Sequence, residues 1–251
     1  MRRMAFGVPS LALATGGGLW AQARRAAHAP LPQFLDHDLS GSYGARNGPA
    51  LRLTLLGDSS LTGPGLESPG HSFMAQVADS LPWNVGVQSM ARGGSRVLDV
   101  LVRQAPAAIM TRPDAFVVAV GTNDVAHGTR AGAFRRRLAA LLDLLEPVAP
   151  VVLFGVADLS IIPRTPSMWR PIMARRSALI DRLGESAVRG RDRVVRVDLV
   201  SRINDEFLRR GHELYAADLF HPNRAGHQFV AEAVTDEVAA ALAAQGLPRA
   251  S

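Results

Sequence analysis

Short apolar runs alternate with longer amphipathic stretches from Leu51 to the C-terminal region. Two of the runs, 115–120 (AFVVAV) and 151–156 (VVLFGV), carry no polar side chain. Such runs are typical of strands that are buried on both faces of a parallel sheet. Together with three similar runs they predict five strands, at 51–56, 84–90, 115–120, 151–156 and 194–199.

The stretches between these runs have the spacing of helices. In 131–145, for example, Leu138, Leu141 and Leu145 recur three and four residues apart, which places them on one helix face. The predicted helices cover 73–81, 97–109, 131–145, 171–188 and 225–244. Regular alternation of strand and helix predicts an α/β fold with a doubly wound parallel sheet, because right-handed crossovers join parallel neighbours.

The composition is that of one globular domain, which we place at 51–251. The chain has 251 residues, 47% of them hydrophobic, and no cysteine. This length and apolar content suffice for a single packed α/β core. The lack of cysteine excludes disulfides, a thiol nucleophile and thiolate metal sites.

The positive charge does not predict a nucleic-acid partner. The net charge is +6, and all 28 basic residues are arginine. Half of the excess charge falls in residues 1–50, and no basic stripe interleaved with aromatic residues follows. A phosphate-binding face needs clustered charge, so we expect no nucleic acid to bind.

Residues 1–29 form a separate segment, in which Met4–Ala23 is free of charge and flanked by arginines. A run of this length can just span a bilayer. We predict a membrane anchor or a signal peptide cleaved after Ala27–Ala29, and hence a membrane-attached or exported protein. The alternative is a tail without function on a cytoplasmic protein. Residues 30–50, rich in proline and glycine, are predicted to be a linker, so we expect catalysis to reside beyond them.

Polar and glycine-containing sequences follow the predicted strands, at the edge where such sheets bind ligands. They are Gly57–Ser60 (GDSS), Arg92–Ser95 (RGGS) and Gly121–Asp124 (GTND); a fourth, Asp218–His221 (DLFH), precedes the last helix. Each alone is compatible with an ordinary turn or helix cap. Their occurrence together, in this order, indicates one common site.

This set of motifs resembles the SGNH subgroup of the GDSL esterases and lipases, over about residues 51–244. The resemblance implies a flavodoxin-like three-layer sandwich with a five-stranded parallel sheet. It also implies a serine nucleophile and the hydrolysis of ester substrates without a cofactor.

The catalytic residues that we predict are Ser59, Asp218 and His221. A serine hydroxyl is a poor nucleophile at neutral pH and needs a neighbouring base, for which His221 is the best candidate. Asp218, three residues earlier, is close enough to accept the other ring N–H and to fix the tautomer of the imidazole. We prefer Ser59 to Ser60 because the family motif ends at Ser59.

Acyl transfer also needs donors for the oxyanion that develops on the carbonyl oxygen. The candidates are the backbone N–H groups of Ser59 and Gly94 and the side-chain amide of Asn123. The family often has an asparagine ahead of the glycine turn, which Met90–Gly94 lacks. The choice between Gly93 and Gly94 is therefore open.

The two acidic neighbours of these residues, Asp58 and Asp124, are interpreted as structural groups that bond loop backbone. No Asp, Glu and His residues have the spacing of metal ligands at the strand ends. We therefore expect neither a metal nor another cofactor.

The predicted function is a serine esterase acting on acyl or acetyl esters of a lipid or a carbohydrate. One alternative is an acyltransferase that uses the same residues, and another is an inactive module that binds a glycan or lipid. The apolar loop 159–170 (LSIIPRTPSMWR) is predicted either to form an acyl pocket or lid, or simply to pack on the sheet edge.

Overall fold

The computed structural model describes residues 32 and 34–246. The predicted signal peptide or anchor therefore lies outside the described residues. Within the described part, no helix has both the length and the apolar composition needed to cross a membrane.

A six-stranded sheet forms the centre of the molecule, in the order β1-β3-β2-β4-β5-β6. The strands are β1 (Gly41–Gly44), β2 (Ala50–Gly57), β3 (Asn84–Ser89), β4 (Ala115–Ala119), β5 (Val151–Phe154) and β6 (Val194–Val197). The five strands from β2 onward are parallel, as predicted. Their spatial order is that of flavodoxin-like sheets, with the reversal of strand order between β2 and β4.

The prediction of five strands is wrong by one, because β1 pairs antiparallel with the edge strand β3. Its sequence, GSYG, has no apolar alternation, and strand pairing through backbone groups alone leaves no side-chain signal. β1 lies within the residues predicted as a linker. Leu39, also in that segment, is only 1% exposed and belongs to the core.

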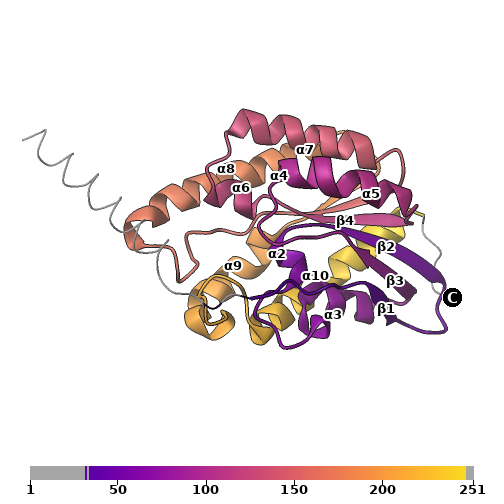
Figure 1. Cartoon of the computed structure of the whole chain (residues 1–251), viewed down its shortest axis with the longest axis horizontal. Helices are drawn as coiled ribbons and strands as arrows, with labels where there is room; N and C mark the ends of the chain where they lie inside the picture. The colour runs from indigo at the N-terminus through magenta and orange to yellow at the C-terminus, as the bar shows by residue number, and fades with distance from the viewer. Residues whose placement is uncertain (1–31, 33, 247–251) are drawn as a thin grey trace, which may run out of the picture.

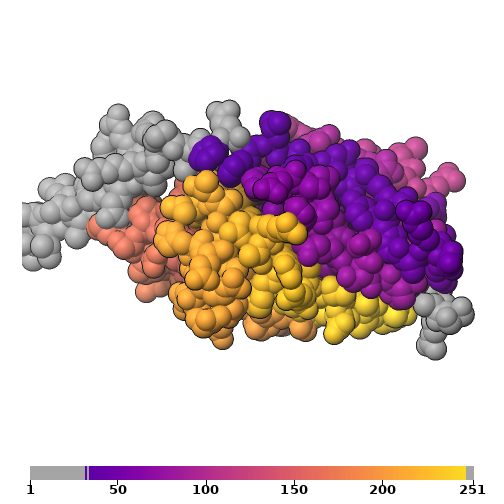
Figure 2. Space-filling model, turned by 90° about the horizontal axis from the view of Figure 1, so that it is seen from below, coloured from indigo at the N-terminus to yellow at the C-terminus, as the bar shows by residue number. Residues whose placement is uncertain are grey.

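Helices cover both faces of the sheet, which confirms the three-layer sandwich (Figure 1). The first layer contains α4 (Val97–Asp99), η2 (Val100–Gln104), α5 (Ala105–Met110), α6 (Thr122–Ala126), α7 (Ala131–Leu145) and α8 (Arg170–Val188). The second contains α2 (Ser59–Thr62), α3 (Phe73–Ser80), α9 (Leu199–Arg210) and α10 (Arg224–Ala244). Figure 2 views this second face, where α9 (orange) and α10 (yellow) lie beside α3 and the first described residues (purple and indigo). Short 3-10 turns complete the chain at Pro69–His71, Ser167–Trp169 and Gly211–Leu214.

The core explains why the predicted helices and strands are found. Every residue of β4 and β5 is buried, as expected for strands between two helical layers. The predicted helix 131–145 has the bounds of α7, and its leucine stripe is buried. The helix α9 was not predicted because most of its residues are polar. Asp198 caps it, and Ile203 and Phe207, one helical turn apart, anchor it to the core.

Candidate active site

The loops after β2 and β4 and the turn before α10 meet around a cavity of about 900 Å³. Its lining includes all five residues predicted to take part in the chemistry: Ser59, Gly94, Asn123, Asp218 and His221. The cavity lies beyond the carboxyl ends of the strands, next to the point where the strand order reverses, which is where sheets of this type bind ligands.

Ser59 is the first residue of α2, directly after β2. The turn into this helix requires glycine at position 57, because φ is +152° and a Cβ there would lie 2.0 Å from the carbonyl oxygen of Ala119. Asp58 caps the helix by accepting the N–H of Ser60 at 3.0 Å. The N–H of Ser59 has no acceptor within the helix, as is usual in a first turn, so it remains available at the cavity.

Asp218 and His221 are joined within a single tight turn. Nδ1–H of His221 donates to Oδ2 of Asp218 at 2.6 Å, and Oδ1 of Asp218 accepts the N–H groups of Phe220 and His221 at 3.0 Å each. Burial raises the pKa of Asp218, but these hydrogen bonds together lower it below its ordinary value. The ionised aspartate thus holds Nδ1 protonated and leaves Nε2 of His221 as the basic nitrogen.

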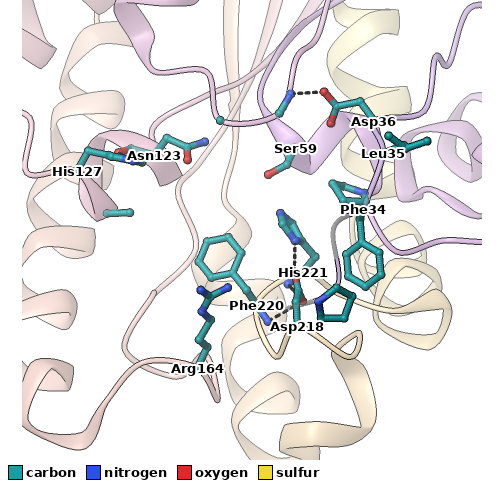
Figure 3. A pocket seen from close by; sticks show the side chains of 15 residues that line it. Phe34, Leu35, Asp36, Ser59, Asn123, His127, Arg164, Asp218, Phe220 and His221 are labelled. Atoms are coloured by element: carbon teal, nitrogen blue, oxygen red, sulfur yellow. Dashed lines mark hydrogen bonds and ion pairs between the residues drawn. The ribbon is translucent and has the colours of Figure 1, made fainter. Parts of the chain in front are cut away.

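Ser59 and His221 project toward the same space in Figure 3. Ser59 is only 8% exposed, and its hydroxyl makes no hydrogen bond to any of the residues that the structure describes. Ser60 does not line the large cavity and lines only a smaller one that adjoins it, whereas Ser59 lines both. This arrangement favours Ser59 over Ser60 as the residue that faces a bound substrate.

The two glycines of the RGGS turn have different environments. The N–H of Gly93 donates to Oδ2 of Asp36 at 2.8 Å, and a Cβ on Gly93 would lie 2.5 Å from Oδ1 of the same carboxylate. Gly94 has a φ of +75°, with open space where a Cβ would be. Its N–H has no acceptor among the described residues. The geometry therefore favours Gly94 as the oxyanion donor.

Asn123 lies in α6, whose first turn follows β4. Gly121 allows the chain to turn there, with a φ of +130° and no room for a Cβ beside Val156. One amide hydrogen of Asn123 points to Oδ2 of Asp58 at 3.4 Å, a long contact that leaves the amide free to donate elsewhere. In Figure 3 this amide points from α6 toward the side of Ser59.

The two acidic neighbours of the candidate residues both accept backbone N–H groups. Asp124 is fully buried, and its Oδ2 accepts the N–H of Val97 at 2.8 Å, which ties α6 to the start of α4. Asp58 is also fully buried. Burial raises the pKa of Asp58 to about 6, against hydrogen bonds from Ser60 and Asn123 that lower it.

A second, smaller cavity of about 110 Å³ adjoins the first, since Ser59 and His221 line both. Its other walls are mainly apolar and include Leu159, Ile162 and Phe207. The beginning of the loop 159–170 thus contributes to this cavity.

Two polar residues near the site were not predicted. Asp36 lies in the supposed linker and bonds the glycine turn, and nothing in its sequence context indicates this. Gln104 is buried; its amide accepts the N–H of Gly57 at 2.8 Å and donates to the carbonyl of Gly57 at 2.9 Å and to Ser95 Oγ at 3.1 Å. Gln104 could have been found from the sequence, because it is a polar residue on the apolar face of a predicted helix.

No site for a metal is evident near these residues. In the described part of the chain, no group of three or more His, Asp and Glu side chains is arranged to hold a metal ion.

Residues 55–229 match the model of the GDSL-like lipase/acylhydrolase family, which covers more than half of the chain. The chain belongs to this family. Membership confirms the prediction of an ester hydrolase and the resemblance drawn from the four motifs. The match begins inside β2 and so does not include β1 or Asp36.

Individual relatives agree with the family assignment. A GDSL-like esterase from Mycobacterium tuberculosis is 26% identical over 246 residues, spanning 88% of this chain and 78% of that protein. Among solved structures, a lipolytic G-D-S-L family protein from Veillonella parvula has a TM-score of 0.61 at 15% identity, covering 74% of this chain and 96% of its own. A variant of an acetyl xylan esterase from Geobacillus stearothermophilus has a TM-score of 0.60 at 20% identity, covering 77% and 96%. These two similarities show the fold.

Proposed function

We propose that the protein hydrolyses carboxylic esters with Ser59 as nucleophile, His221 as general base and Asp218 as the residue that orients His221. The observation that carries this proposal is the 2.6 Å hydrogen bond between His221 and Asp218 in the cavity that Ser59 also lines. Nε2 of His221 accepts the proton of Ser59 as Oγ attacks the ester carbonyl carbon.

The attack moves the carbonyl electrons onto oxygen, and the backbone N–H groups of Ser59 and Gly94 and the amide of Asn123 stabilise the resulting oxyanion. When the intermediate collapses, His221 returns the proton to the departing alcohol and an acyl-serine remains. Water then attacks the acyl-serine, gives its proton to His221, and the carboxylic acid leaves as Ser59 recovers its proton. The sequence of steps needs no metal or other cofactor.

The unequal sizes of the two cavities suggest how an ester would be divided between them. The apolar cavity of about 110 Å³ is much the smaller of the two and suits a short acyl group. The open cavity of about 900 Å³ has room for a much larger alcohol. We therefore propose short-chain acyl esters of a bulky alcohol, such as a sugar, as substrates. The name of the acetyl xylan esterase, whose fold is similar, agrees with that class.

The deciding experiment is labelling with a fluorophosphonate, which reacts with an activated serine. Wild type and Ser60→Ala should be labelled, whereas Ser59→Ala and His221→Ala should not. Because Ser59 and His221 act as a unit, each loss should reduce turnover of p-nitrophenyl acetate to a similar degree, and Asp218→Ala should reduce it less. Labelling that survives in Ser59→Ala but not in Ser60→Ala would refute the assignment of the nucleophile.

Two further measurements test the substrate. Across p-nitrophenyl esters of increasing chain length, kcat/KM should be highest for short acyl groups and fall once the chain exceeds the small cavity. Adding a sugar alcohol to the reaction separates hydrolysis from transfer, since an acyltransferase would form the new ester faster than free acid.

A further inference from the structure

One side chain from residues 34–50, which precede the part of the chain matched by the family model, contacts the Gly93–Gly94 turn of the site. This side chain is Asp36. Oδ2 of Asp36 accepts the N–H of Gly93 at 2.8 Å, and Oδ1 accepts the hydroxyl of Thr62 at 2.6 Å. Thr62 belongs to α2, the helix that begins with Ser59. One carboxylate therefore joins the segment that carries the serine to the loop that carries Gly94; the bond of Asp36 to this loop is drawn in Figure 3.

The residues that follow Asp36 are held to the domain. The N–H of His37 donates to the carbonyl of Thr62 at 3.0 Å, and Nε2 of His37 bonds the carbonyl of Leu66 at 2.9 Å. Leu39 is buried in the core, and β1 continues from there along the edge of the sheet. Asp36 is thus fixed from outside the glycine turn rather than carried by it.

The conformation of Gly94 explains why the hydrogen bond from Gly93 to Asp36 matters. Gly94 adopts a positive φ with no side chain and nothing packed where a Cβ would be. A glycine backbone without such contacts has many accessible conformations, and only some of them direct its N–H toward an oxyanion. The bond from the N–H of Gly93 to Asp36 holds the Arg92–Gly93 peptide, which is adjacent to the peptide that carries the N–H of Gly94, and so reduces this freedom.

We propose that Asp36 is a positioning residue for ester hydrolysis: it holds the Gly93–Gly94 turn so that the N–H of Gly94 faces the developing oxyanion. This inference rests on the proposed function. On this proposal residues 34–50 belong to the catalytic domain, contrary to the expectation that catalysis resides beyond residue 50.

The test compares Asp36→Ala, Asp36→Asn and Asp38→Ala in the full chain. Losing one oxyanion donor outright costs ~10²–10³ in rate; Asp36 only positions such a donor, so we expect Asp36→Ala to lower kcat about tenfold with KM little changed. Asn offers one oxygen to Gly93 and one amide hydrogen to Thr62, so Asp36→Asn should keep most of the kcat. Asp38, two residues away and exposed, hydrogen-bonds Ser40 and no other residue in the described part of the chain, which makes Asp38→Ala the matched control.

A second readout distinguishes positioning from loss of structure. A trifluoromethyl ketone forms a tetrahedral adduct whose oxyanion resembles the transition state, and its affinity for Asp36→Ala should fall by the same factor as kcat/KM. Thermal unfolding checks that the variant is folded. If Asp36→Ala has the kcat and the trifluoromethyl ketone affinity of wild type, or if Asp36→Asn is as slow as Asp36→Ala, the positioning role is wrong. If wild type itself shows no Ser59-dependent hydrolysis, the proposed function fails, and this inference fails with it.

Discussion

Replacing Asp58 by asparagine should stabilise the protein at neutral and alkaline pH but not in acid. Asp58 is fully buried beside the proposed nucleophile, and burial raises its pKa from 3.8 to about 6. A shift of about two units corresponds to roughly 3 kcal/mol. This is the cost of holding the ionised carboxylate in the folded state, and it is an upper value for the effect of the substitution.

The sign follows from proton uptake. Between pH 4 and pH 6 the folded state keeps a proton on Asp58 that the unfolded state has already lost, so stability from this group falls as pH rises through that window. Above pH 6 Asp58 is ionised in both states, and the free-energy cost of burying its charge is constant. Asparagine carries no charge at any pH and is also a good N-cap for α2. Asp58→Asn should therefore raise the free energy of unfolding by up to about 3 kcal/mol at pH 8, and by little at pH 4.

In wild type, the change in the free energy of unfolding with pH does not report on Asp58 alone, because the pKa of His227 is also shifted. Burial, with a smaller effect from the charge of His221, lowers the pKa of His227 from 6.5 to about 4. Stability from His227 is therefore lost as pH falls through nearly the same window, with the opposite sign. The two effects largely offset each other in wild type, so only the difference between variants reveals either one.

The assay is urea unfolding of wild type, Asp58→Asn and Asp38→Asn at pH 4.5, 6 and 8. The exposed Asp38 is a suitable control because hydrogen bonds from Ser40 lower its pKa, so its neutralisation should not stabilise the fold. A gain for Asp58→Asn that is independent of pH, or a loss of stability at pH 8, would refute the explanation from burial of charge.

Three further outcomes are expected. Relative to wild type, His227→Phe should gain up to about 3 kcal/mol of stability as the pH falls from 6.5 to 4, measured by the same urea unfolding; a difference from wild type that does not change with pH would contradict the lowered pKa. Gln104→Leu should lower the free energy of unfolding by ~1–3 kcal/mol and slow hydrolysis, because it leaves the buried N–H of Gly57 without its acceptor, while the carbonyl of Gly57 keeps the N–H of Arg92; thermal unfolding and kcat measure both, and a neutral result would show that the N–H finds another partner. Dialysis against EDTA should leave activity and melting temperature unchanged, and activity restored only by a divalent ion would contradict the proposed mechanism.

The sequence by itself determined the features that depend on local patterns. The apolar runs of β4 and β5 predict strands covered on both faces, and the leucine stripe of α7 predicts its helix, because side-chain periodicity directly reflects burial. The pair Asp218 and His221 was also readable, since three residues of separation make their hydrogen bond a matter of one turn.

Only the tertiary structure revealed the features that depend on contacts between segments far apart in the sequence. β1 has no alternating apolar pattern because its residues are exposed or half-buried at the edge of the sheet, where it pairs with β3. The sequence left the choice between Gly93 and Gly94 open, and the structure favours Gly94 because Asp36, 57 residues away in the chain, takes the N–H of Gly93. A hydrogen bond of that kind requires only a carboxylate and a backbone N–H, which occur throughout any sequence, so it becomes visible only when folding brings the two segments together.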